Sequence, residues 1–314
     1  MPAFSASVPG KIILFGEHAV VYGEPAIAVP VTSLHTRAIV TANIKGESGE
    51  IHVEAPDISL SAALFDLQDN HPIRAAILAA IGPDKDPASV PACNILITSS
   101  IPPSSGLGSG AAVSAAIIRA LSAFLGKRLS DEIVSDLTYN VEKIHHGTPS
   151  GIDNTVVAYQ QPIYYQKGDP FQFLDIPEPF TILIADCGIP GNTKDAVERV
   201  RQNSINDPDK YEMIFQSIGQ ITQEARELIL AGLPAELGPL MDKNHQFLQD
   251  LDISLPELDH LVNTARNEGA LGAKISGGGL GGNIIALVNG DTNEICEALS
   301  KAGAVNTLVT SINT

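Results

Sequence analysis

The sequence predicts a chain of mixed strands and helices in two domains, and three observations support this. Short apolar segments that alternate with polar residues dominate the first hundred residues. Segments of helical periodicity dominate residues 194–268, and a proline-rich stretch separates these two parts. We therefore expect an N-terminal domain over residues 1–178 and a C-terminal domain over residues 179–314.

The N-terminal domain is expected to begin with β-structure. Residues 11–31 hold two apolar runs around a Gly-Glu-His segment, a pattern typical of strand, turn and strand. Residues 36–44 and 49–55 alternate in polarity and are expected to form a hairpin. The remaining elements are expected at 70–82 (helix), 93–102 (strand), 110–125 (buried helix) and 129–147 (helix capped by Ser130).

The C-terminal domain is expected to begin with a strand at residues 180–188, which are almost wholly apolar. Four helices are then expected near 194–203, 209–231, 234–250 and 256–268. The chain is expected to end with a glycine-rich turn between two strands (273–288), a helix (291–302) and a strand (304–312).

Composition excludes several classes of protein. The formal charge is −17, which repels nucleic acid and anionic membranes, so we expect neither as a partner. The N-terminus lacks the charged and apolar regions of a signal peptide, and the apolar run after residue 110 is interrupted by polar residues. The three cysteines lie far apart, which indicates reduced thiols in a cytoplasmic protein and no zinc site.

A glycine-rich segment, "SSGLGSGAA" at residues 104–112, lies between an expected strand and a buried helix. It is not a Walker A loop, because no Gly-Lys-Ser/Thr follows, and it lacks the GxGxxG spacing of dinucleotide-binding proteins. The N–H groups at a helix N-terminus favour an anion, and glycines let a phosphate approach closely. The segment is therefore either a phosphate-binding loop or a structural turn.

A second segment, "PGKIILFGEHAVVYG" at residues 9–23, places Glu17 and His18 among apolar residues and Lys11 at the start of a strand. A Glu-His pair is usually a solvated surface turn. Charged groups surrounded by buried residues need partners, however, so a role in a pocket is the alternative.

A third segment, "VEKIHHGTPSGIDNTV" at residues 141–156, carries two acidic residues. At about 100° per residue, Glu142 lies about 130° from the centre of the apolar stripe of its helix, which consists of Ile133, Val134, Leu137, Val141 and Ile144. It is therefore either solvated or directed into a cleft. Asp153 follows a Gly-x-Pro-Ser-Gly turn and so lies on rigid backbone, as catalytic groups often do.

The fourth segment, "SGGGLGG" at residues 276–282, is rich in glycine. Its strand-like flanks favour close approach of the backbone to another group, and the alternative is an ordinary flexible loop.

Taken in order, the four segments resemble the motifs of the GHMP kinase family, which is named for galactokinase, homoserine kinase, mevalonate kinase and phosphomevalonate kinase. The resemblance extends over nearly the whole chain, and the first and third segments are similar to the mevalonate kinase pattern. It implies a two-domain α+β fold, with a ribosomal-protein-S5-like N-terminal α/β domain and a ferredoxin-like C-terminal domain. It also implies an ATP-dependent enzyme that phosphorylates an alcohol.

The resemblance implies a role for particular residues. Asp153 would be the base that accepts the proton of the substrate hydroxyl, and Lys11 would stabilise the charge that develops there. Both would contact the substrate, together with Glu17, His18 and Thr193. The main chain around the ATP phosphates would be that of Pro103, Ser104, Ser105, Gly106, Leu107, Gly108, Ser109, Gly110 and Ala111. The turn 276–282 would support this loop.

The same resemblance implies Mg²⁺ as a cofactor beside ATP, with Glu142 as a ligand. One position departs from the family. Many mevalonate kinases carry a second, metal-binding serine in the second motif, and Gly110 stands in its place here. Ser109 remains as a candidate ligand, and Ser104 or Ser105 could substitute for the missing serine. Water is a further alternative, because Mg²⁺ usually keeps several waters.

The resemblance thus implies transfer of the ATP γ-phosphate to the 5-hydroxyl of mevalonate, giving 5-phosphomevalonate in isoprenoid biosynthesis, with a homodimer as a possible assembly. The alternatives are phosphomevalonate, the mevalonate 3-hydroxyl or a sugar as acceptor, or a non-catalytic sensor with the same fold. The sensor is disfavoured because Lys11, Glu142 and Asp153 are all present.

Overall fold

The computed structural model describes residues 3–103, 105–146 and 149–313. Its contacts divide the chain into two compact units. Unit 1 comprises the chain up to Gly10, Leu34–Pro103 and Gly108–Gln160, and unit 2 comprises Lys11–Ser33, Ser104–Leu107 and Gln161 onward. The division into folding domains after residue 178 stays a prediction, because these units are defined by contacts and interleave along the chain.

The first sheet of the described residues has the strand order β4-β3-β5-β2-β6-β7, and β1 pairs with β2. Its strands are β1 (Ala3–Phe15), β2 (Ala26–Ala42), β3 (Ile51–Ala55), β4 (Leu60–Ala63), β5 (Cys93–Ser99), β6 (Ile163–Tyr165) and β7 (Gln172–Phe173). The expected hairpin of residues 36–44 and 49–55 is wrong. Strand β5 lies between the two, antiparallel to β2 and parallel to β3, and the antiparallel partner of β3 is β4.

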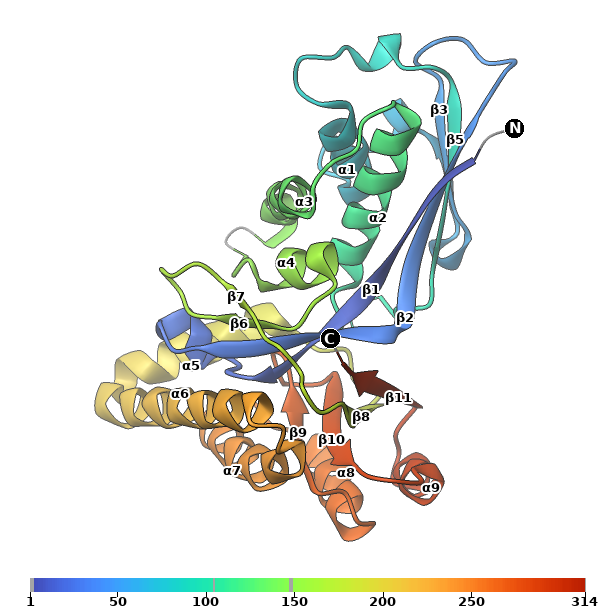
Figure 1. Cartoon of the computed structure of the whole chain (residues 1–314). Coiled ribbons are helices and arrows are strands. Elements are labelled where there is room, and N and C mark those ends of the chain that lie inside the picture. Colours follow the sequence, from blue (N-terminus) through green and yellow to red (C-terminus); the bar gives the residue numbers. More distant parts are fainter. Residues whose placement is uncertain (1–2, 104, 147–148, 314) are drawn as a thin grey trace. The chain divides into compact units, whose positions relative to one another are not determined.

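The helices of unit 1 gather on one face of its strands (Figure 1). They are α1 (Pro72–Ile81), α2 (Ser109–Phe124), α3 (Asp131–His146) and α4 (Ile152–Tyr159). Helix α2 is the apolar centre of the group, because its alanines and isoleucines are buried and it packs against α1, α3 and α4. Its N-terminus is thereby fixed at the end of the glycine-rich segment. The sequence correctly predicted α1, α2 and α3 but not α4.

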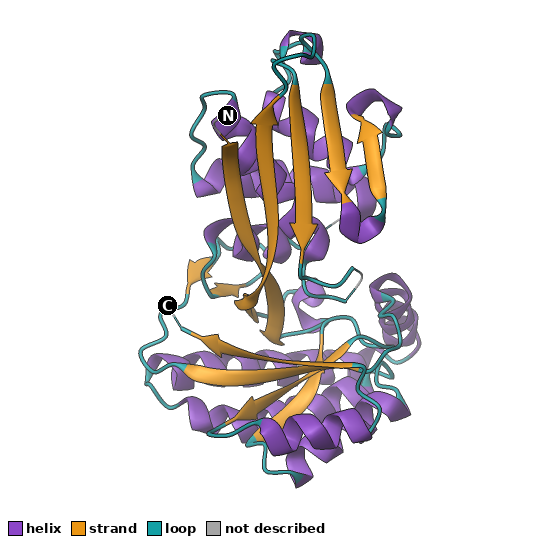
Figure 2. Cartoon of the chain, turned by 90° about the vertical axis from the view of Figure 1, so that its right-hand side faces the viewer, coloured by secondary structure: helices purple, strands orange, loops and turns teal. Residues whose placement is uncertain are grey.

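The second sheet lies wholly in unit 2 and is antiparallel, with the order β11-β8-β10-β9 (Figure 2). Its strands are β8 (Phe180–Asp186), β9 (Gly272–Ser276), β10 (Asn283–Val288) and β11 (Asn306–Ile312). The helices of this unit are α5 (Thr193–Asn206), α6 (Pro208–Leu230), α7 (Leu237–Asp250), α8 (Pro256–Asn267) and α9 (Asn293–Lys301). All these strands and helices lie close to their predicted positions.

Strands β9 and β10 are buried along their whole length, and α7 and α8 pack against the sheet. The glycine-rich turn 277–282 joins these two strands, so its position is set by one of the best-packed parts of the unit. Short 3-10 helices complete the fold: η1 (Ala19–Tyr22), η2 (Pro56–Ile58), η3 (Leu64–Asp66), η4 (Pro87–Ser89) and η5 (Pro234–Glu236). None of the helices in the described residues is long and apolar enough to cross a bilayer.

Candidate active site

The first motif forms a buried turn at the end of β1. Lys11, Glu17 and His18 are 6%, 3% and 6% exposed, so the interpretation as a solvated surface turn is wrong. Gly16 has φ +94°, and a Cβ there would lie 2.3 Å from the carbonyl oxygen of Pro25. Only glycine allows the chain to turn this close to the start of β2, and this turn directs the next two side chains inward.

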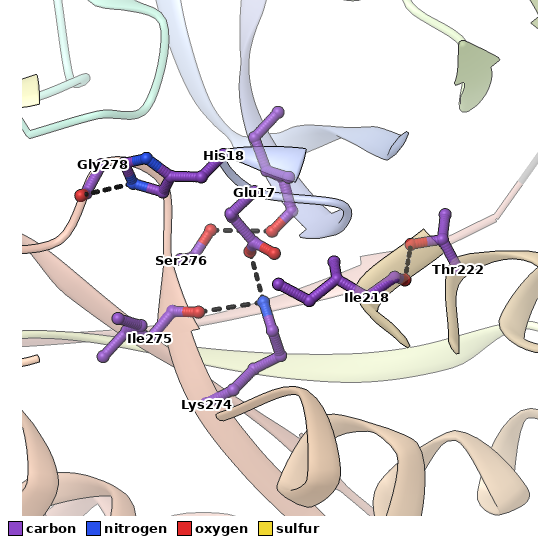
Figure 3. A network of polar contacts seen from close by, with 9 residues as sticks. Glu17, His18, Ile218, Thr222, Lys274, Ile275, Ser276 and Gly278 are labelled. Carbon is purple, nitrogen blue, oxygen red and sulfur yellow. Dashed lines mark hydrogen bonds and ion pairs between the residues drawn. The ribbon is translucent and has the colours of Figure 1, made fainter. Parts of the chain in front are cut away.

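The C-terminal sheet holds this turn in place through three contacts (Figure 3). Lys274 forms a buried ion pair with Glu17. Ser276 Oγ donates to the carbonyl oxygen of Ile13 at 2.7 Å, and His18 Nε2 lies 2.8 Å from the carbonyl oxygen of Gly278. Strand β9 and the turn that follows it therefore hold the first motif in place.

Burial changes the protonation of these groups. Burial raises the pKa of Glu17, whereas the nearby cation of Lys274 and, more weakly, that of Lys11 lower it. Burial likewise lowers the pKa of His18, and its contact with the Gly278 carbonyl counteracts this only in part. His18 is therefore neutral at neutral pH, and its Nε2 donates to that carbonyl.

The glycine-rich segment is attached to the same unit at two points. The main-chain N–H of Lys11 donates to the carbonyl oxygen of Leu107 at 2.9 Å. Asn283 Nδ2, directly after the C-terminal glycine-rich turn, donates to the carbonyl oxygen of Ser105 at 2.6 Å. These bonds join the first motif, the loop and the C-terminal sheet. The expected support of the loop by the turn 276–282 is thus provided by its neighbour Asn283.

Within the segment, Gly106 and Gly108 have φ +76° and +74°, which favour glycine. Helix α2 begins at Ser109 directly after Gly108, and the N–H groups of a first helical turn have no partner within the helix. Pro103 is exposed and Ala111 is buried. Ser104, also predicted to bind the nucleotide, lies outside the described residues.

Unit 1 holds the two acidic residues of the third motif. Glu142 on α3 is 8% exposed, so the interpretation as a solvated side chain is wrong. Asp153 is half-buried in the first turn of α4, after Gly151 at φ +89°. The glycine makes the sharp entry into the helix possible, which supports the expectation of a rigid position for Asp153.

Helix α3 buries only part of the apolar stripe that the sequence indicated, including Val134 and Val141. Ile133 and Ile144 of that stripe are 46% and 49% exposed. Ser135 on the buried face instead accepts a hydrogen bond at 2.9 Å from Asn154 Nδ2 of α4. Glu142 follows Ser135 by seven residues, about two turns, and so lies on this same face. A polar contact between helices thus sets the orientation of Glu142.

An arginine on α2 fixes the far end of α4. Arg119 donates to the carbonyl oxygen of Ala158 at 2.7 Å and pairs with Asp131 of α3 at 2.5 Å. A cation at a helix C-terminus satisfies a carbonyl that has no partner in the helix and is favoured by the helix dipole. The helix that carries Asp153 is therefore anchored to both α2 and α3.

Thr193 is the first residue of α5 and lies beside the turn 277–282. A Cβ at Gly278 would come within 2.8 Å of its Oγ1. The turn is also held by its own main-chain N–H groups. That of Leu280 donates to the carbonyl oxygen of Ile253 and that of Gly282 to the carbonyl oxygen of Ile189, both at 2.8 Å. The interpretation of this turn as a flexible loop is therefore wrong.

In the described part of the chain, no three His, Cys, Asp or Glu residues gather closely enough to form a metal site on their own. The buried carboxylate of Glu142 offers the oxygen chemistry that Mg²⁺ prefers. A serine Cβ at position 110 would meet no described atom within 4 Å, so the fold leaves room for the hydroxyl that is missing there.

The predicted site residues divide between the two units. Unit 2 brings together the first motif, residues 105–107 of the loop and Thr193, whereas Glu142, Asp153 and residues 108–111 belong to unit 1. The sequence interpretation missed Lys274 and Asn283. Lys274 offered a signal, because it is a lone cation in an apolar strand and such a charge requires a buried partner.

Comparison with known proteins identifies the family. The model of the GHMP kinases N terminal domain matches residues 70–161, and that of the GHMP kinases C terminal matches residues 225–305. The mevalonate kinase of Pyrococcus horikoshii is 37% identical over 96% of this chain and 93% of that protein.

Solved structures agree with this. The mevalonate kinase of L. major in complex with R-mevalonate has a TM-score of 0.82 at 29% identity, covering 98% of this chain and 95% of that one. The Methanococcus jannaschii mevalonate kinase has a TM-score of 0.83 at 26% identity, covering 100% and 98%. This chain therefore belongs to the GHMP kinase family and has its two-domain α+β fold.

Proposed function

We propose that this protein transfers the γ-phosphoryl group of ATP to the 5-hydroxyl of mevalonate, giving ADP and 5-phosphomevalonate in isoprenoid biosynthesis. Membership of the family makes it an ATP-dependent kinase. Similarity to mevalonate kinases over nearly the whole chain supports the acceptor. The observation that carries the proposal is the bond from Lys11 to Leu107, which joins the segment characteristic of mevalonate kinases to the glycine-rich loop.

In this proposal the glycine-rich segment, Pro103 to Ala111, binds the ATP phosphates with main-chain N–H groups. The segment leads directly into the N-terminus of α2, and the N-terminus of a helix favours negative charge. The protein carries a net charge of −17, so phosphate needs such local compensation. In this proposal the main chain therefore provides most of the binding of the ATP phosphates, and few cationic side chains are needed to neutralise their charge.

The chemical step that we propose forms a bond between the acceptor oxygen and the γ-phosphorus, and breaks the bond from that phosphorus to the β–γ bridging oxygen. ADP leaves with the electron pair of the broken bond, and Asp153 accepts the proton of the hydroxyl. Lys11 stabilises the negative charge on the acceptor oxygen. Glu17, His18 and Thr193 bind and orient the acceptor.

Mg²⁺ is proposed as the cofactor, with Glu142 and Ser109 as its protein ligands, and it would neutralise phosphate charge during transfer. Glu142 is suited to this because its carboxylate is buried on the α3 face that contacts α4. We also propose a homodimer in the cytoplasm, and sedimentation of the purified protein checks the dimer.

The acceptor is tested by measuring ADP release from ATP with mevalonate, phosphomevalonate, galactose and homoserine offered separately, and by identifying the product by mass spectrometry. We expect activity with mevalonate and phosphorylation at its 5-hydroxyl. Phosphorylation of the 3-hydroxyl, or activity only with another acceptor, contradicts the proposal. A protein that binds ATP but phosphorylates none of the four supports a sensor instead.

Replacing Asp153 tests the proposed base. The variant Asp153→Asn keeps the shape but cannot accept the proton, so kcat should fall by about 10²- to 10⁴-fold while ATP binding is retained. Asp84→Asn is the matched control, because Asp84 is an exposed aspartate of the same unit. Equal turnover by the two variants removes Asp153 from the role of base.

A further inference from the structure

The carboxylate of Glu17 is held at only one of its two oxygens. Oε1 accepts the ion-pair hydrogen bond from Lys274 (Figure 3). Oε2 is equally buried, and it has no hydrogen-bond partner among the described residues. A buried, charged oxygen without a hydrogen-bond partner costs free energy. A ligand that donates a hydrogen bond to Oε2 would remove this cost.

Lys274 directs its ammonium group to the protein itself. Its side chain is 0% exposed, and its Nζ also donates to the carbonyl oxygen of Ile275 at 2.9 Å and lies 5.8 Å from the ring centroid of Phe15. Glu17, whose second oxygen has no partner among the described residues, is therefore the member of this ion pair that is left to bind a substrate group. Lys274 differs in this from Lys11, which is proposed to act on the acceptor oxygen directly.

The position of Lys274 belongs to a regular pattern. Lys274, Ser276 and Gly278 occupy every second position, and each contacts the first motif, at Glu17, Ile13 and His18 respectively. Alternate side chains of a strand face the same side, so Lys274 and Ser276 of β9 are presented together, and the turn after β9 adds the carbonyl oxygen of Gly278. The lysine is thus one of three ties that set the turn of the first motif.

The charges around Glu17 agree with this arrangement. Lys274 and Lys11 are the cations that lower its pKa against the effect of burial. His18 has a pKa lowered by burial, and burial also lowers that of the nearby His245 to about 4, so both are neutral at neutral pH. Lys274 therefore provides most of the compensation for a carboxylate at this place.

We propose that Lys274 is a positioning residue that binds one oxygen of Glu17 and thereby directs the other to a hydroxyl group of the acceptor. This rests on the proposed function, in which Glu17 binds the acceptor. It also limits the ligand at this point. The group that meets Oε2 is a hydrogen-bond donor such as an alcohol, because a carboxylate or phosphate would be repelled.

The test compares Lys274→Met with the double variant Glu17→Gln/Lys274→Met. In the single variant Glu17 loses its ion-pair partner, so the pKa of the Glu17 carboxyl rises. Its Oε2 then becomes protonated, and stops accepting a hydrogen bond from the substrate hydroxyl, at a higher pH than in the wild type. We expect the KM for the acceptor to rise by about 10- to 100-fold, the range of a charged hydrogen bond. The acid limb of kcat/KM should move to higher pH, whereas the KM for ATP should change by less than about threefold.

The double variant separates positioning from folding. It leaves no unpaired charge, and replacing a whole buried ion pair is often neutral for stability, so thermal unfolding should return towards that of the wild type. Its acceptor KM should nevertheless stay high. Lys243→Met is the matched control, since Lys243 is an exposed lysine of the same unit and should leave all these values unchanged.

A wild-type acceptor KM in the stable double variant overturns the proposal, and this holds even if the single variant does not fold. Parallel changes in both KM values, with an unshifted pH profile, also overturn it. The comparison uses whichever of the four acceptors the wild type phosphorylates. Lack of activity with mevalonate therefore contradicts the proposed function while the role of Lys274 is still tested.

Discussion

The two glycine-rich segments of this chain have similar compositions but very different surroundings. In the first, a Cβ built at Gly106 or Gly110 meets no described atom within 4 Å. In the second, a Cβ at Gly279 would lie 2.4 Å from the carbonyl oxygen of Ile253, and one at Gly281 would lie 2.5 Å from that of Ile189. Glycine in the second segment lets the protein pack against itself. In the first it leaves the backbone open, as a ligand would require.

The largest effect on stability is expected at the packed turn. In Gly281→Ala the methyl group meets two carbonyl oxygens, and the backbone keeps φ +128°, so the free energy of unfolding should fall by about 2–5 kcal/mol. Urea unfolding measures this. Gly290→Ala is the control, because it has φ +79° in open space and should lose only about 1–2 kcal/mol. Equal losses would show that the packing of the turn matters little.

A smaller loss of stability and a larger loss of nucleotide binding are expected at the open loop. Gly106→Ala keeps φ +76°, which costs about 1–2 kcal/mol, and it meets no protein atom. Its methyl group should instead hinder the phosphates, so the KM for ATP should rise by about tenfold, or about 1.4 kcal/mol. An unchanged KM for ATP in steady-state kinetics would make this segment a structural turn.

The smallest effect is expected at Gly110, which lies in the first turn of α2 with open space around it. Gly110→Ala should change the free energy of unfolding by less than about 1 kcal/mol, in the stabilising direction. Gly110→Ser adds the hydroxyl that many mevalonate kinases carry in this motif, and it should lower the Mg²⁺ concentration for half-maximal rate. Ser109→Ala should raise that concentration. If neither variant changes it, the serines of this loop are not metal ligands.

The elements of the fold were largely predictable because their signals are local. The apolar run of α2, the Ser130 cap of α3 and the long periodic segments of unit 2 all lie within a few residues of the features that they explain. The pairing of strands is not local. Alternation in residues 36–55 indicated two strands but could not show that β5, about forty residues later, lies between them.

The candidate site shows the same limit. Lys11, Glu17 and His18 could be selected from their segment, and they are buried as a pocket role requires. The ion-pair partner of Glu17, Lys274, is 257 residues away, and only the paired strands of the second sheet bring it there. The orientation of Glu142 depends likewise on a bond between Asn154 and another residue of α3, which apolar periodicity cannot reveal.

The central claim is that the main chain of the open loop binds the ATP phosphates whereas the packed turn does not contact them. Hydrogen–deuterium exchange of the wild-type protein, with and without a non-hydrolysable ATP analogue and Mg²⁺, tests this directly. We predict slower exchange in peptides covering residues 105–111 and no change in those covering 277–282, where Leu280 and Gly282 already donate to carbonyl oxygens. Protection of 277–282 without protection of 105–111 would contradict the account.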